Sequence, residues 1–260
     1  MSNIVDLAAA EQGAGPPIVI LHGLFGSARN WGAIARRLAE QHRVFALDLR
    51  NHGASPWTAS MDYAEMAGDV RAFVERRNLG PVALVGHSMG GKVGMVLALQ
   101  APALVERLVV VDIAPVRYPP AYLSFVEAMR GVDLDRAARR AEVGARLADG
   151  VPDEGVRQFL LQNLVAEEGR LRWRVNLDTL ETAMPALSDF PDFPDDAAYE
   201  GPTLFVAGAR SDYVQPEHRA AIRRLFPKAS LVRLRDAGHW IHAERPEEFL
   251  DTLLPFLDAG

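Results

Sequence analysis

A serine between glycines is the clearest candidate for chemistry in this sequence. Residues 86–90 read Gly-His-Ser-Met-Gly, a G-x-S-x-G motif that follows an expected strand and opens an expected helix. In that context the motif is typical of a sharp strand-to-helix turn that exposes the serine at the carboxyl end of a sheet. Glycine two positions before and after the serine avoids a clash with neighbouring backbone. Ser88 is therefore predicted to be a nucleophile.

A serine hydroxyl needs a base within hydrogen-bond reach, because it is almost entirely un-ionised at neutral pH. His239, in the segment 236–240 (Asp-Ala-Gly-His-Trp), comes just after the last expected strand. The histidine is last in chain order in this arrangement, so we expect its loop at the same sheet edge as Ser88. We predict that His239 is the base. The other histidines are expected to pack, to lie on the surface or to make structural hydrogen bonds beside the site: His22, His42, His52, His87, His218 and His242.

Attack by a serine produces an oxyanion that needs hydrogen-bond donors, and losing one such donor costs about 2.7–4 kcal/mol in a hydrolase. Two backbone amides are candidates. Met89 directly follows the nucleophile, and Leu24 lies in the loop 22–26 after the first buried strand. Glycines in that loop allow it to curl toward Ser88.

These residues require a sheet whose strands end at one edge. Short apolar runs alternate with longer amphipathic stretches, the pattern of parallel strands joined by crossover helices. Strands are expected at 17–21, 43–49, 81–86, 105–113, 202–207 and 230–235, and helices at 30–41, 62–78, 89–100, 216–226 and 246–257. The predicted fold class is α/β, with a mostly parallel, doubly wound sheet.

The strand pattern stops between Ala114 and about Gly201. Four helical stretches are expected there, at 119–130, 133–149, 153–166 and 175–188. The proline-containing segment 189–196 cannot continue a helix. We interpret residues 114–201 as a helical cap insertion with its return linker, and residues 1–113 with 202–260 as the core.

Composition excludes several other classes of protein. The chain has 260 residues, 49% of them apolar, and 28 basic against 34 acidic residues give a net charge of −6. It can therefore bury a large core, but it lacks a basic stripe for nucleic acid. With no cysteine it has neither disulfides nor thiolate chemistry. We find no nucleotide-binding or zinc motif, so no cofactor or metal is expected. A signal peptide and a membrane-spanning run are not recognised either, which predicts a cytoplasmic location.

Five phrases of the sequence together resemble a known family. They are LHGLFGSARNW, DLRNHGAS, GHSMGGK, VVDIAP and DAGHWIHAERP. In order and spacing they are similar to serine esterases of the α/β-hydrolase fold, in the YbfF-like branch that includes the abhydrolase domain-containing protein 11 type. The resemblance spans nearly the whole chain. It implies hydrolysis of carboxylic ester or acyl thioester bonds without a cofactor, and a helical cap over the site.

The acid that would orient His239 does not fit the family pattern simply. The family commonly has G-x-x-D after the strand before the last, whereas residues 208–211 place Ser211 in that position and Asp212 follows one residue later. A one-residue offset usually turns a side chain away. Asp112, at the carboxyl end of an expected strand, is a position that some family members use. We predict that Asp112 is the acid, with Ser211 as a secondary hydrogen-bond partner and Asp212 as the alternative.

Other residues are assigned more weakly. Asp48 and Arg50 are expected to brace the loop beside the site, and Lys92 is not expected to be a nucleophile, because an amine must first be desolvated or crowded by cations. Aromatic side chains are candidates for substrate contact, although those of the cap can equally pack within it: Phe25, Tyr122, Phe125, Trp173 and Trp240.

The predicted function is an esterase or thioesterase acting on a small-molecule acyl substrate through an acyl-enzyme. A lactonase, a methyl-ester hydrolase acting on a carrier-bound acid, or a cofactor-free perhydrolase would use the same site. Dehalogenases and epoxide hydrolases resemble this fold with aspartate in place of Ser88 and are disfavoured. A ligand receptor without catalysis is also disfavoured, because Ser88, His239 and an acid are all present. The sequence leaves the oligomeric state open.

Overall fold

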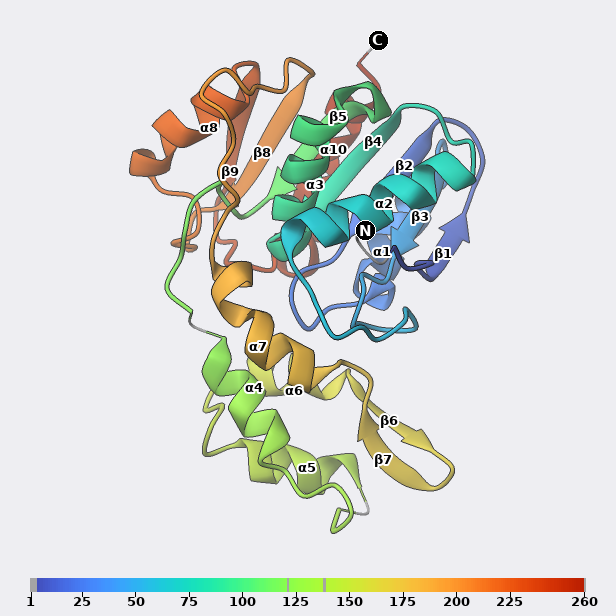
Figure 1. Cartoon of the computed structure of the whole chain (residues 1–260), viewed down its shortest axis with the longest axis vertical. Helices are drawn as coiled ribbons and strands as arrows, with labels where there is room; N and C mark the ends of the chain where they lie inside the picture. Colours follow the sequence, from blue (N-terminus) through green and yellow to red (C-terminus); the bar gives the residue numbers. More distant parts are fainter. Residues whose placement is uncertain (1–3, 121, 138, 260) are drawn as a thin grey trace.

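The computed structural model describes residues 4–120, 122–137 and 139–259. Seven strands form one sheet in the order β1-β3-β2-β4-β5-β8-β9, and only β1 runs antiparallel to its neighbour (Figure 1). The strands are β1 (Ala9–Gln12), β2 (Pro17–Leu21), β3 (Arg43–Leu47), β4 (Val82–His87), β5 (Val105–Val111), β8 (Thr203–Gly208) and β9 (Ala229–Leu234). The predicted α/β class with a mostly parallel sheet is confirmed.

Helices cover both faces of the sheet, because successive residues of each strand point to opposite sides and both sides are apolar. Ile20 and Val109 belong to the buried cluster that packs under α1 and α10, whereas Val19 and Val110 belong to the cluster under α2 and α3. The helices of this part are η1 (Ala28–Trp31), α1 (Gly32–Leu38), α2 (Tyr63–Arg76), α3 (Met89–Gln100), η2 (Pro102–Leu104), η3 (Pro216–His218), α8 (Arg219–Leu225), α9 (Ile241–Glu244) and α10 (Pro246–Leu257). The doubly wound arrangement is therefore confirmed.

A second group of elements, residues 123–188, extends from one end of the sheet (Figure 1). It contains α4 (Leu123–Arg130), α5 (Arg140–Leu147), α6 (Glu154–Leu161), β6 (Leu164–Glu167), β7 (Arg170–Trp173) and α7 (Leu177–Ser188). We call it the α4–α7 segment. Hydrogen bonds tie it to the sheet part: the Tyr63 hydroxyl donates to the Leu187 carbonyl at 2.6 Å, and the Asn163 amide donates to the Phe25 carbonyl at 2.8 Å.

The structure corrects the sequence prediction in this segment. A helix was expected over 153–166, but α6 ends at Leu161 and a two-stranded antiparallel hairpin, β6–β7, follows. Glu168 and Gly169 form its two-residue turn, with φ of 50° and 79°, and positive φ at both turn residues is what a tight hairpin requires. The short edge strand β1 was also not expected.

The parallel strands bring their carboxyl ends to one edge, and the candidate residues follow four neighbouring strands. Ser88 follows β4, Asp112 follows β5, Ser211 and Asp212 lie beyond β8, and His239 lies beyond β9. The order β4-β5-β8-β9 therefore gathers residues that are far apart in sequence. Over the described residues, none of the helices is long and apolar enough to span a membrane.

Candidate active site

Ser88 lies on a strained turn between β4 and α3. Its φ of 51° and ψ of −118° are unusual for a residue with a side chain, and such strain is concentrated at functional sites. A Cβ atom on Gly86 would lie 2.3 Å from the Gly90 carbonyl oxygen, and one on Gly90 would lie 2.5 Å from that of Leu21. Both glycines are thus required for the turn, as the motif predicts. The serine side chain is left at the sheet edge, 7% exposed.

His239 is held by a buried carboxylate. Its Nδ1 lies 2.8 Å from Oδ2 of Asp112, whose side chain has no exposed surface. The Gly208 amide donates to Oδ1 of Asp112 at 2.9 Å, and the Ser211 hydroxyl donates to Oδ2. Because Asp112 engages Nδ1, the ring nitrogen Nε2 is the one available to accept a proton.

Asp212, the alternative acid, points elsewhere. Its side chain is exposed and its Oδ1 accepts a hydrogen bond from Nε2 of Gln215 at 3.4 Å. The one-residue offset from the usual acid position has therefore turned this carboxylate away from His239. Ser211, in the usual position, contacts Asp112 instead.

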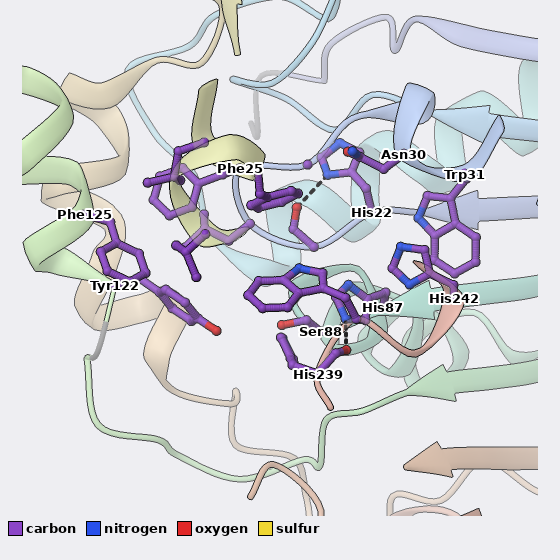
Figure 2. A pocket seen from close by; sticks show the side chains of 17 residues that line it. His22, Phe25, Asn30, Trp31, His87, Ser88, Tyr122, Phe125, His239 and His242 are labelled. Atoms are coloured by element: carbon purple, nitrogen blue, oxygen red, sulfur yellow. Dashed lines mark hydrogen bonds between the residues drawn. The ribbon is translucent and has the colours of Figure 1, made fainter. Parts of the chain in front are cut away.

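Two further side chains fix the position of His239. Nε2 of His87 donates to the His239 carbonyl at 2.8 Å (Figure 2). The ring of Tyr213 stacks on the imidazole, with centroids 4.1 Å apart and planes 27° apart. Tyr213 was not predicted to belong to the site, because an aromatic residue two positions after Ser211 carries no recognisable signal.

The loop 22–26 is braced by neutral histidines. Nε2 of His22 accepts from the Leu49 amide at 3.0 Å, and Nε2 of His52 accepts from the Phe25 amide at 3.2 Å. Both rings are buried, which lowers the pKa of His22 to about 4 and that of His52 to about 3. They are therefore neutral and can accept these bonds. The Gly26 amide donates to the Gly23 carbonyl at 2.9 Å, so the loop curls as expected.

The polar residues after β3 are structural, as predicted. The Asp48 carboxylate accepts from the Ala28 and Ala54 amides, both at 2.7 Å. Arg50 forms a buried ion pair with Asp69, with Nε 2.6 Å from Oδ2. These contacts hold the loops beside Ser88 in place.

Two cavities meet at Ser88, and Leu24 and Tyr122 line both of them with it. The cavity that His239 also lines, which we call the His239 cavity, has about 480 Å³ including its open mouth (Figure 2). The second, which we call the Lys92 cavity, has about 440 Å³. Four predicted contact residues line the His239 cavity: Phe25, Tyr122, Phe125 and Trp240.

Trp173, the fifth predicted contact residue, is not among the described residues that line either cavity at Ser88, so its prediction as a substrate contact is wrong. Its side chain is 8% exposed, and its Nε1 donates to the Met129 carbonyl at 3.0 Å. It therefore packs inside the α4–α7 segment and borders a separate surface hollow with Arg130.

Lys92 is more deeply buried than the sequence suggests, with a residue exposure of 1%. It lines the Lys92 cavity, and burial lowers its pKa to about 7. Within the described ranges, histidine, aspartate and glutamate side chains form no group of three or more that could hold a metal ion.

Comparisons with known proteins agree with this architecture. A mouse protein described as sn-1-specific diacylglycerol lipase ABHD11 is 44% identical, over 93% of this chain and 81% of its own length. Esterase YbfF of Escherichia coli is 35% identical, with 98% of each chain covered. A solved structure described as a marine microorganism esterase is 36% identical with a TM-score of 0.94, covering 97% of this chain and 100% of that one. A family model described as the alpha/beta hydrolase fold matches residues 16–246, and the chain belongs to that family.

Proposed function

We propose that this chain hydrolyses carboxylic esters through an acyl-enzyme, with Ser88 as nucleophile, His239 as base and Asp112 as the acid that orients His239. The observation that carries the proposal is the 2.8 Å contact between Nδ1 of His239 and a fully buried Asp112, beside a cavity that Ser88 and His239 share. Relatives described as an esterase and a lipase support ester bonds as the substrate class.

In the first half of the reaction, Oγ of Ser88 attacks the acyl carbon while Nε2 of His239 takes the hydroxyl proton. The bond between the acyl carbon and the alcohol oxygen then breaks, and His239 returns the proton to that oxygen. In the second half, water attacks the acyl-serine with the same proton transfers and releases the acid. Asp112 stays ionised and stabilises the imidazolium that forms in each half.

The amides of Met89 and Leu24 are proposed to stabilise the oxyanion. Met89 is the first residue of α3, and amides in the first turn of a helix have no acceptor within that helix. Leu24 lines both cavities with Ser88, which supports its amide as the second donor.

We further propose that residues 114–201 act as a cap that limits substrates to small acyl esters. Phe125 and Phe159, from α4 and α6, line the His239 cavity and support this role. A cytoplasmic location stays a prediction.

The experiment is a comparison of the parent chain with Ser88→Ala on p-nitrophenyl butyrate. We expect a loss in kcat of about 10⁶-fold, as for the nucleophile of another serine hydrolase. A fluorophosphonate should label the parent at Ser88 and leave the variant unlabelled. Ser230→Ala, on the edge strand β9, is the matched control and should behave as the parent. Equal rates for the parent and Ser88→Ala would refute the proposal.

A further inference from the structure

A buried ammonium faces the second cavity at Ser88. Lys92 lies one helical turn after Ser88 on α3, and residues four apart lie on the same face of a helix. Its Nζ donates to the Asp189 carbonyl at 2.6 Å and approaches the Ser188 carbonyl at 3.4 Å, at the carboxyl end of α7. No carboxylate of the described residues forms an ion pair with it.

The ammonium has bonding capacity that these carbonyls do not use. It carries three protons, of which two point to the carbonyls. The rings of Tyr118 and Tyr63 lie 4.9 and 5.4 Å from Nζ and stabilise a cation without accepting a full hydrogen bond. The Asp189 carboxylate is near enough to favour the charged form of Lys92, but its ion pair is with Arg117, 3.8 Å away. A buried charge is normally paired directly, and the cavity is where a bound anion would supply a direct partner.

The proposed mechanism decides which part of an ester reaches this cavity. The leaving alcohol must receive its proton from His239. This histidine lines the His239 cavity, and it is not among the described residues that line the Lys92 cavity. Tyr213, which lines the Lys92 cavity, covers one face of the imidazole. The alcohol therefore occupies the His239 cavity, and the acyl chain occupies the Lys92 cavity.

We propose that Lys92 is a specificity-determining residue that binds an anionic group, such as a carboxylate, at the far end of the acyl chain. The proposal rests on the function proposed above and narrows its substrate class to half-esters of dicarboxylic acids and chemically similar acyl groups.

The test compares monomethyl esters of succinate, glutarate and adipate with the same esters in which the free carboxylate is a primary amide. The amide has the same shape without the charge. The measured quantity is the ratio of kcat/KM for the carboxylate to kcat/KM for the amide, by methanol release. A charge-assisted hydrogen bond predicts a ratio of about 10 to 100 for the best chain length, falling to one or less in Lys92→Gln. Lys228→Gln, at an exposed lysine, should keep the parent ratio.

The ratio separates substrate recognition from a structural role. If Lys92 only anchors α7, the variant loses both activities together and its ratio equals that of the parent, which would overturn the proposal. A parent ratio of one or less would overturn it too. If the amide ester is hydrolysed only when Ser88 is present, the proposed function stands regardless of that result. If even this neutral ester is not hydrolysed, it is the proposed function that fails.

A measurement on the parent alone decides the matter where Lys92→Gln does not fold. Because burial lowers the pKa of Lys92 to about 7, its charge is present below that pH and lost above it. The titratable groups around it are Tyr63 on α2, Tyr118, and Asp189 at the end of α7. The substrate carboxylate is ionised throughout, and any effect of pH that acts equally on both esters cancels in the ratio. The ratio should therefore fall about tenfold between pH 6 and pH 8, and a constant ratio would overturn the proposal.

Discussion

Replacing Asp112 with asparagine tests the proposed triad at its least obvious member. In the parent, Oδ1 of Asp112 accepts from the Gly208 amide at 2.9 Å and Oδ2 faces Nδ1 of His239 at 2.8 Å. The Gly208 amide is a fixed donor, so an asparagine at position 112 must turn its oxygen to it and its NH₂ to His239. That NH₂ donates to Nδ1 and moves the ring proton to Nε2. The imidazole then cannot accept the proton of Ser88.

The expected loss follows from this change of tautomer. The same substitution in another serine hydrolase lowers kcat by about 10⁴-fold with its geometry intact, and we expect about 10³–10⁴-fold here. Such a loss corresponds to about 4–5.5 kcal/mol of transition-state stabilisation. The assay is kcat on p-nitrophenyl butyrate, with the melting temperature measured to show that the variant is folded.

Asp212→Asn is the control because this carboxylate is exposed and contacts Gln215. We expect a change in kcat of less than about threefold, since surface substitutions rarely shift free energies by more than about 0.5 kcal/mol. If Asp212→Asn lost more activity than Asp112→Asn, the assignment of the acid would be wrong. A folded Asp112→Asn with the parent kcat would refute the tautomer argument itself.

Two further predictions concern stability. Burial lowers the pKa of His22 to about 4 and of His52 and His242 to about 3, whereas unfolding returns them to about 6.5. The unfolded chain therefore binds more protons at acidic pH. The free energy of unfolding, measured in urea, should fall between pH 6 and pH 5 by about 1 kcal/mol for each histidine. This fall should be smaller in His242→Phe than in the parent, and an equal or larger fall would contradict the prediction. Arg50→Met should lower the free energy of unfolding by about 3–5 kcal/mol, because it leaves the buried Asp69 carboxylate without its ion-pair partner. Chemical denaturation measures this change, and a loss below about 1 kcal/mol would contradict the prediction.

Most of the fold was predictable because its strands are buried on both faces. A run such as Leu108–Val111 packs under helices on each side, so it is continuously apolar and stands out from the amphipathic helices around it. The hairpin β6–β7 carries a weaker signal. Its strands have four residues each and lie outside the main sheet, and Leu161 and Leu164 fit the helical period as well. Only Gly169, in a turn that requires positive φ, distinguishes the two interpretations.

The candidate site was likewise predictable only where local sequence determines the structure. The turn that carries Ser88 depends on glycines two residues before and after it, so it can be recognised from five consecutive residues. The choice between Asp112 and Asp212 depends on where β9 delivers His239, which no local pattern contains. The position of Trp173 was misjudged, and the burial of Lys92 was not foreseen. Neither the neighbours of a side chain nor its degree of desolvation can be obtained from its position along the chain.

The register of the sheet explains why an acid after β5 can serve this site. His87 pairs with Val111 across β4 and β5, so Ser88 and Asp112 are the next residues of the two strands. The Ser88 amide donates to the Val111 carbonyl at 2.9 Å, and the Asp112 amide donates to the Val206 carbonyl of β8 at 2.8 Å. Both residues have a φ of 51°, which turns each chain out of the sheet at the same level. An acid leaving β5 at that level reaches His239 across β8, and Ser211, leaving β8, donates to the same carboxylate. The hydrogen-bonding position that the family commonly gives to aspartate is thus occupied by a donor that holds an acid from the neighbouring strand.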